Sequence, residues 1–262
     1  MADEFGKVSA AKSDHTYELK ESLSAIRAIP SMVLEPVSAQ VDHPLSGQEI
    51  EALRQKHVTS LSVDAKANPE LFRKPVIFPK LWALELSDDD NLQYLPDLLA
   101  NYKSLSVFGI GPNVRLTESQ MQFLSRFRNL EFLTLSIDSN TVLTLPPHLK
   151  GLWINNPFRC TTLKGLESLS IRGCRIDQPF INDLHAPNLR SLNLINCDIE
   201  PDALRSIGKL HSIRALELDG SSMADGEYRY INQLRQAAIW IPERGRLPVP
   251  SKSLVKSIPF LD

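Results

Sequence analysis

The chain has 262 residues, of which 23% are charged and 42% hydrophobic, and its formal net charge is -2. This length allows a sizeable core, and the composition excludes wholesale disorder and a collagen-like protein. The charge gives no positive field to hold nucleic acid or an anionic membrane, no run of about 18 apolar residues predicts a transmembrane helix, and three cysteines do not make a disulfide framework.

The first 44 residues are rich in Ser and Ala and contain Pro30, Pro36 and Pro44. We therefore expect residues 1–44 to form a flexible N-terminal segment, and we find in it no apolar core of a Sec signal peptide. Ser46 and Glu49 have the spacing of a capping box, which predicts a helix over residues 45–57. We expect this helix to cover the N-terminal end of the structure that follows.

Residues 58–245 contain a repeated pattern, and the chain has 39 leucines against only 11 glycines. Apolar residues occupy the first, fourth and sixth positions of a nine-residue stretch, and a turn-forming residue occupies the ninth. The clearest copies are LRSLNLINC and LESLSIRGC, which begin at Leu189 and Leu166. First positions at 58, 81, 102, 130, 149, 166, 189, 213 and 234 define about nine units with a mean spacing of 22 residues.

This period predicts an α/β repeat solenoid, a leucine-rich repeat horseshoe with a parallel β-sheet on its concave face. Short helices and extended segments are expected on the convex face. Thr117 and Gln120 predict one helix by their capping-box spacing, and Pro201 and Gly208 delimit another. The Pro-rich stretch TVLTLPPHLKGL is expected to be extended, and residues 246–262 are expected to form a C-terminal cap and tail.

Two stretches resemble a known kind of repeat. LPPHLKGLWINN, residues 145–156, resembles the LPPxLxxLxVxxN unit of leucine-rich repeat effectors that Gram-negative pathogens inject into host cells. LRQAAIWIPERGRLP resembles the C-terminal repeat of such effectors, whereas LRSLNLINCDIEPDALRSIGKL resembles the Cys-containing repeats of F-box and ribonuclease-inhibitor-like proteins. The resemblance covers about residues 58–245.

The effector resemblance implies a type III secreted bacterial protein that acts in the host cytoplasm, with the Ser-rich start as its secretion signal. Without secretion, the protein is expected in the bacterial cytoplasm. Members of that family often carry a ubiquitin-ligase domain. About 20 residues follow the last repeat here, without a Cys-centred catalytic motif, so we do not expect ligase activity. The alternative is that the repeats are the substrate-recognition component of a ubiquitin ligase.

Alternate residues of a strand face opposite sides of a sheet, so the third, fifth and seventh positions of each unit are expected on the concave face. Most of these positions carry small side chains, with large ones standing among them. Aromatic residues and Arg dominate binding hot spots, which predicts a partner protein bound at this face. The candidate binding residues are Phe108, Phe132, Trp153, Arg172, Asn155, Ile195 and Trp240. A shifted register, or packing of the aromatic rings on one another, is the alternative interpretation.

The sequence predicts no catalytic site, no metal site and no cofactor. The SDDDN turn at residues 87–91 lacks the spacing of a calcium loop, and the six His show no spacing with Ser, Cys or Asp. Cys174 and Cys197, one repeat apart, are expected to be buried free thiols on adjacent strands. We therefore predict a non-catalytic protein-binding module without nucleic-acid or membrane partners. An enzyme with another kind of site and a solenoid that binds through its convex face remain alternatives, and the oligomeric state is open.

Overall fold

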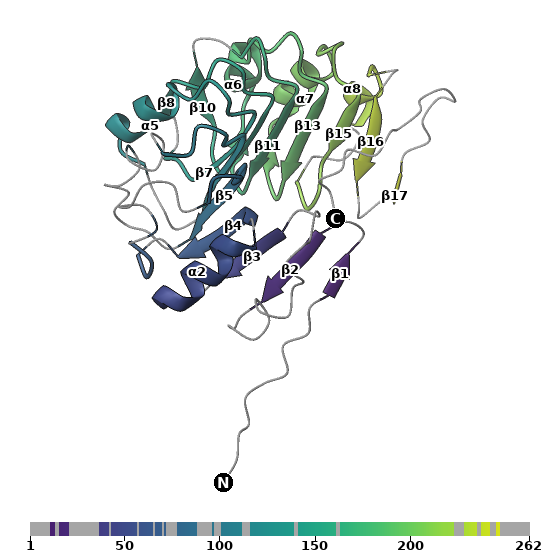
Figure 1. The fold of residues 1–262 in the computed structure, drawn as a ribbon. Coiled ribbons are helices and arrows are strands. Elements are labelled where there is room, and N and C mark those ends of the chain that lie inside the picture. The colour runs from purple at the N-terminus through teal and green to yellow at the C-terminus, as the bar shows by residue number, and fades with distance from the viewer. Residues whose placement is uncertain are drawn as a thin grey trace. The chain divides into compact units, whose positions relative to one another are not determined.

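The computed structural model forms two compact units, Met1–Ser136 and Ile137–Asp262. Each unit is built on a mainly parallel sheet (Figure 1). The structure describes residues 11–13, 16–20, 37–41, 43–56, 58–64, 66–69, 71, 78–87, 96, 101–111, 116–138, 141–160, 163–222, 228–234, 237–241 and 245–246. Within these residues, no helix has both the length and the apolar character that crossing a lipid bilayer requires.

The sheet of the first unit follows the order of the chain. Its strands are β1 (Ala11–Ser13), β2 (Thr16–Lys20), β3 (Val37–Val41), β4 (Val58–Asp64), β5 (Ala83–Ser87), β6 (Val107–Ile110) and β7 (Phe132–Leu135). β1 is antiparallel to β2, and every later pair in this unit is parallel. Helix α2 (Gly47–Gln55) connects β3 to β4, and α5 (Glu118–Leu124) precedes β7.

The second unit repeats one strand-and-return motif with little variation. Its main sheet contains β9 (Gly151–Ile154), β11 (Ser168–Arg172), β13 (Ser191–Ile195), β15 (Ala215–Glu217), β16 (Ala238–Ile241) and the antiparallel β17 (Gly245–Arg246). Helices α6 (Gln178–Asp183), α7 (Pro201–Ile207) and α8 (Tyr228–Ile231) lie on one side of it (Figure 1). The remaining strands are short and follow the main ones: β8 (Thr141–Leu143), β10 (Phe158–Cys160), β12 (Arg175–Ile176) and β14 (Asp198–Ile199).

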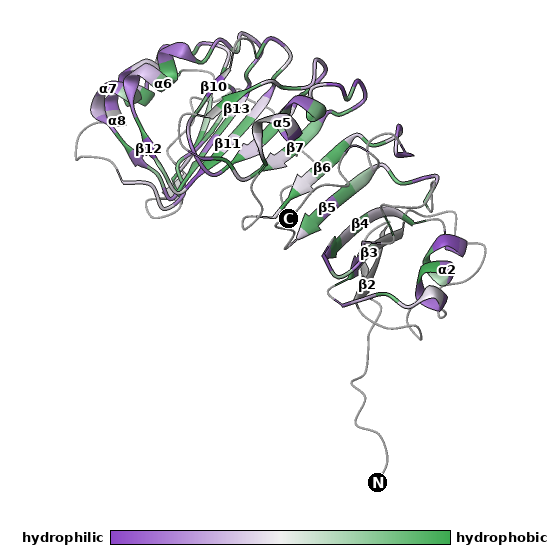
Figure 2. Ribbon diagram, turned by 90° about the vertical axis from the view of Figure 1, so that its left-hand side faces the viewer, coloured by the Kyte–Doolittle hydropathy of each residue, from purple (hydrophilic) through white to green (hydrophobic). Residues whose placement is uncertain are grey.

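The core of each unit is a set of apolar columns that run across the strands. In the second unit the fourth repeat position stacks in register through the buried residues Leu152, Leu169, Leu192, Leu216 and Ile239. A single repeat cannot bury such a residue on its own, whereas stacking removes each one from water at a gain of about 1.5–3 kcal/mol. In Figure 2 apolar residues accordingly concentrate along the strands. The predicted leucine-rich repeat solenoid is confirmed.

The turns after three successive strands of the second unit, β11, β13 and β15, share one backbone conformation. The eighth repeat position has a positive φ angle at Gly173, Asn196 and Gly220, with values of 68°, 51° and 58°. Glycine adopts this conformation without steric cost, and asparagine tolerates it better than most residues. At the ninth position Ser221 donates its Oγ–H to the carbonyl of Leu194 at 2.7 Å and accepts the N–H of Cys197 at 3.0 Å. The Ser221 side chain thus satisfies two backbone groups of the preceding repeat.

The local helix signals are confirmed, but the N-terminal end differs from the expectation. Ser46 with Glu49, and Thr117 with Gln120, form reciprocal capping boxes at the starts of α2 and α5. The described part of the segment 1–44, which was expected to be flexible, contains strands β1 to β3: β2 and β3 extend the parallel sheet beyond β4, and β1 pairs antiparallel with β2. Helix α2 is therefore a connection between two strands, and it does not cover the end of the sheet. The rest of that segment and residues 247–262 of the predicted C-terminal cap and tail fall outside the described residues.

Candidate functional site

In each unit, we call the face of the sheet opposite the buried leucine column the outward face. It carries the third and fifth repeat positions and corresponds to the face that the sequence predicts to be concave. In the second unit the strand pairing aligns one row of fifth-position side chains across this face: Trp153, Ser170, Asn193, Glu217 and Trp240. A neighbouring row of third-position residues holds only small side chains: Gly151, Ser168, Ser191, Ala215 and Ala238. Since adjacent strands lie about 4.8 Å apart, two tryptophans stand roughly 19 Å apart with smaller residues between them.

The middle of this row is polar and shielded from solvent. Ser170 and Asn193 are each 6% exposed, although both belong to the outward face. Ser191 lies beside them and donates its hydroxyl to the Asn193 side-chain oxygen at 3.3 Å. Buried polar groups of this kind need hydrogen-bond partners, and this hydrogen bond satisfies one acceptor of Asn193. We call this buried polar part of the face, formed by Ser170 and Asn193, the polar floor.

Glu217 and Trp240 form the C-terminal part of the row. The Trp240 side chain is 44% exposed, one of two large exposed apolar side chains among the described residues. Burial raises the pKa of the Glu217 carboxyl above its ordinary value, and the nearby Asp219 carboxylate raises it further. A partner protein can therefore pack apolar groups on the exposed Trp240 indole and place hydrogen-bond donors at the Glu217 carboxyl beside it.

Arg172 and Ile195 are confirmed as neighbours on the outward face. The two residues pair on β11 and β13, and Arg172 is exposed whereas Ile195 is half-buried. Trp240 lies on the same face but in a different row from the one predicted. The repeat template placed it at the seventh position, while the structure pairs it with Glu217, which places it at the fifth. A shift of two residues keeps a side chain on the same face of a strand.

Asn155, one of the predicted binding residues, also forms a hydrogen bond to the backbone of the preceding turn. Its Oδ1 atom accepts the backbone N–H of Ile137 at 2.8 Å. The neighbouring Asn156 donates its side-chain N–H to the carbonyl of the same Ile137 at 2.7 Å. The two amides thus satisfy both backbone groups of a buried residue in the preceding turn.

The prediction that Phe108 lies on the outward face is wrong. Phe108 is 1% exposed and pairs with Leu84 in the apolar column of the first unit. The repeat begins at Leu105 rather than at Tyr102, and Tyr102 itself is buried. The segment LSVFGIGPN then fits the nine-residue template with Phe at the fourth position. A unit that starts at Leu105 lies 24 residues after Leu81 and 25 residues before Leu130, so the spacing of the units becomes regular here. This regular spacing was the signal in the sequence for the correct register.

In the first unit the outward positions next to Phe132 are Val107 and Gly109. Phe132 pairs with Val107 on β6, and both side chains are half-buried. Gly109 pairs with Glu85, and a Cβ atom at position 109 would lie 3.2 Å from the Glu85 Cγ atom. The absence of a side chain at this position leaves room for the Glu85 carboxylate on the outward face.

The cysteines lie close together, as predicted, but in the turns that follow the adjacent strands β11 and β13, and only one of them is buried. The Sγ atoms of Cys174 and Cys197 are 3.9 Å apart; both are free thiols, Cys197 buried and Cys174 half-buried. The hydrogen bond between them lowers the pKa of Cys197 to about 7 and raises the pKa of Cys174. Among the residues that the structure describes, no group of three or more His, Cys, Asp or Glu side chains has the arrangement of a metal site. Residues 88–91 of the SDDDN turn fall outside those residues.

Comparison with protein-family models gave no match, and neither did comparison with curated protein sequences. Solved structures with a similar fold include TLR13 in complex with ssRNA13, which is 16% identical with a TM-score of 0.45. That similarity covers 79% of this chain and 40% of the TLR13 chain. The internalin InlF from Listeria monocytogenes is 14% identical with a TM-score of 0.37 over 78% of this chain and 71% of its own. These similarities concern the fold alone, and they give no support to the predicted exclusion of nucleic acid or to the effector resemblance.

Proposed function

We propose that this leucine-rich repeat protein is a non-catalytic module that binds a partner protein through the outward face of its second unit. The observation that carries the proposal is the row between Trp153 and Trp240, in which two large aromatic side chains flank the buried polar floor of Ser170 and Asn193. Large aromatic residues surrounded by small neighbours are typical of the anchors that supply most of the binding energy in protein interfaces.

The charges on this face favour a protein over a nucleic acid. Glu217 pairs with Trp240 on the outward face, and the Asp219 carboxylate lies near enough to Glu217 to raise its pKa. Glu85 is exposed on the outward face of the first unit. Carboxylates repel phosphate groups, whereas nucleic-acid binding depends on cations that replace the counterions of the phosphates. Arg172 is the one positively charged residue among the candidate binding residues. Its guanidinium group can donate hydrogen bonds to a carboxylate or a carbonyl group of a protein partner.

The parallel sheet gives this face a preformed shape. Its side chains project from paired strands whose apolar columns are buried, so little conformational entropy is lost when a partner binds. An affinity capture from host-cell lysate tests the proposal. A protein captured by the wild-type chain and lost with a folded Trp153→Ala/Trp240→Ala variant supports it, whereas equal capture by both chains contradicts it.

We further propose that the partner is a host protein and that the chain is a type III effector of a Gram-negative bacterium. The proposal rests on the similarity of LPPHLKGLWINN to effector repeats and on the Ser-rich start of the chain. A fusion of residues 1–44 to a translocation reporter tests it: delivery into host cells that requires an intact secretion apparatus supports an effector. The alternative is a substrate-recognition component of a ubiquitin ligase, which predicts that ubiquitin-conjugating proteins co-purify with the chain.

A further inference from the structure

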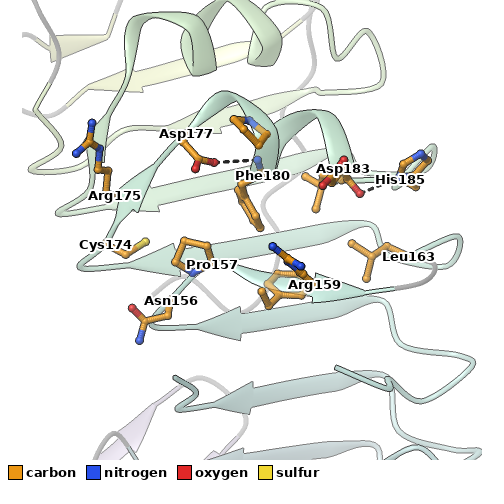
Figure 3. A pocket seen from close by; sticks show the side chains of 13 residues that line it. Asn156, Pro157, Arg159, Leu163, Cys174, Arg175, Asp177, Phe180, Asp183 and His185 are labelled. Atoms are coloured by element: carbon orange, nitrogen blue, oxygen red, sulfur yellow. Dashed lines mark hydrogen bonds between the residues drawn. The ribbon is translucent and has the colours of Figure 1, made fainter. Parts of the chain in front are cut away.

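A second row of short strands follows the main sheet of the second unit, and this row is interrupted. β8 pairs with β10, and β12 pairs with β14, each as a separate two-stranded parallel sheet. In the part of the chain that the structure describes, β10 and β12 are not paired with each other. A pocket of about 710 Å³ lies at the interruption, with residues of β10 on one wall and the segment Cys174–Asp183 on the other (Figure 3). We call it the β10–β12 pocket.

The wall formed by β12 presents an open backbone edge. Asp198 donates its N–H to the carbonyl of Cys174 at 2.9 Å, and Glu200 donates to the carbonyl of Ile176 at 3.0 Å. Backbone groups of alternate residues in a strand point to opposite sides, so the N–H and C=O of Arg175 point away from β14. They face the gap towards β10, where a further strand of the row would pair.

The floor of the pocket is aromatic. Phe158 from β10 and Phe180 from α6 meet edge to face, with ring centroids 5.7 Å apart. Leu163 and Leu184 also line the pocket, and Leu163 donates its N–H to the carbonyl of His185, another lining residue, at 3.4 Å. A side chain that enters from solvent would therefore contact apolar groups. The pocket volume lies within the range of ordinary ligand sites.

Two of the charged side chains around the pocket already have partners. Arg175 forms an ion pair with Glu200 at 2.6 Å, and Asp177 accepts the backbone N–H of Phe180 at 2.9 Å. Arg159 differs, because its side chain is exposed and forms no ion pair within the described residues. In Figure 3 its guanidinium group points from β10 into the gap below Phe180. Arg159 is thus a cation without an ion-pair partner among the described residues, beside an apolar floor. The exposed Asp183 carboxylate also lines the pocket.

We propose that the β10–β12 pocket binds an extended segment of a partner protein by strand addition. The segment pairs with the Arg175 backbone, places an apolar side chain on Phe158 and Phe180, and places an acidic side chain at Arg159. About four residues match the wall from Cys174 to Asp177, since a strand rises about 3.3 Å per residue. Backbone pairing supplies affinity in such complexes, and side-chain contacts supply specificity. This site lies outside the outward face and is independent of the function proposed above.

Selection of a phage-displayed library of seven-residue peptides on the full chain tests the proposal. We expect enrichment of peptides in which an acidic residue alternates with an apolar one. The Arg159→Glu variant is expected to lose at least tenfold in affinity for them and to select basic peptides instead. Arg190→Glu reverses an exposed charge outside the pocket and should leave their affinity unchanged, as should Trp240→Ala on the outward face.

Methylation of single peptide amides separates strand addition from side-chain binding without altering the protein. Methylation at the amide that pairs with Arg175 should abolish binding, whereas methylation at the next amide should have little effect. NMR shift changes should concentrate at residues 174–180 and spare Glu217. The proposal is overturned if no peptide is enriched, if the peptides bind Arg159→Glu as tightly as the wild type, or if methylation at every position has the same effect.

Discussion

Trp240 lies directly beside Glu217 on adjacent parallel strands, and both side chains belong to the outward face of the second unit. The indole is exposed, while partial burial and the neighbouring Asp219 raise the pKa of the carboxyl. Neither residue is needed for the apolar columns of the core. The pair therefore allows binding and stability to be tested separately.

Replacement of Trp240 by Ala is expected to weaken partner binding by about 2 kcal/mol or more, which is at least a roughly thirtyfold increase in Kd. The reason is the loss of a large exposed aromatic anchor, and its exposure implies only a small change in stability. Isothermal titration calorimetry with the captured partner measures the effect. Val142→Ala provides a matched control, because Val142 is 63% exposed on β8, away from the outward face. Equal losses in the two variants would contradict the assignment of the face.

Glu217 makes the stability of the chain depend on pH in a defined direction. A carboxyl whose pKa is raised in the folded state binds a proton more tightly there than in the unfolded chain. Stability therefore falls as the pH rises from the ordinary carboxyl value through the raised pKa. Glu217→Gln should be slightly more stable than the wild type at neutral pH, and the difference should shrink in acid. Urea unfolding at several pH values measures this, and a variant less stable at pH 7 would contradict it.

The corrected register predicts unequal losses of stability for substitutions at two adjacent residues. Phe108→Ala should destabilise the protein by about 3–5 kcal/mol, because it empties a fully buried position of the first unit. Val107→Ala, on the half-buried outward side of the same strand, should cost less than about 1 kcal/mol. Chemical denaturation of the two variants decides between the registers. If Val107→Ala were the more costly change, Phe108 would belong to the outward face after all.

The two amides that hold Ile137 differ in the group each one uses. Asn155→Asp keeps the oxygen that accepts the Ile137 N–H, so stability should change little. Asn156→Asp removes the N–H that is donated to the Ile137 carbonyl and leaves two acceptors facing each other, at an expected cost of about 1–3 kcal/mol. Thermal unfolding of both variants at pH 7 provides the comparison. Similar losses in both would show that the amides do not have these distinct roles.

Sequence patterns predicted those features that depend on neighbours along the chain. Both capping boxes are confirmed, because each is a reciprocal contact between residues three apart. The columns of the second unit are also confirmed, since LESLSIRGC and LRSLNLINC match the repeat template. The register around Phe108 was missed because Phe replaces Leu at the fourth position there and Tyr102 gave a competing start. Strands β1 to β3 were missed because they carry few leucines and are recognisable only by their pairing in the sheet, β1 with β2, β2 with β3 and β3 with β4.

The candidate site was predictable only in outline. Alternation along a strand placed Arg172 and Ile195 correctly, and it placed Trp240 on the correct face in the wrong row. The burial of Ser170 and Asn193, the raised pKa of Glu217 and the β10–β12 pocket all arise between different repeats. A repeat template describes each unit separately, so it contains no information about such contacts.

Site-specific photocrosslinking from the outward face tests the central claim most directly. A photoreactive amino acid at Ala238, which lies beside Trp240 on β16, is compared with the same amino acid at Val142 in the presence of the captured partner. Binding through the outward face predicts a crosslinked partner from position 238 and none from position 142. Crosslinking from position 142 but not from position 238 would contradict the account.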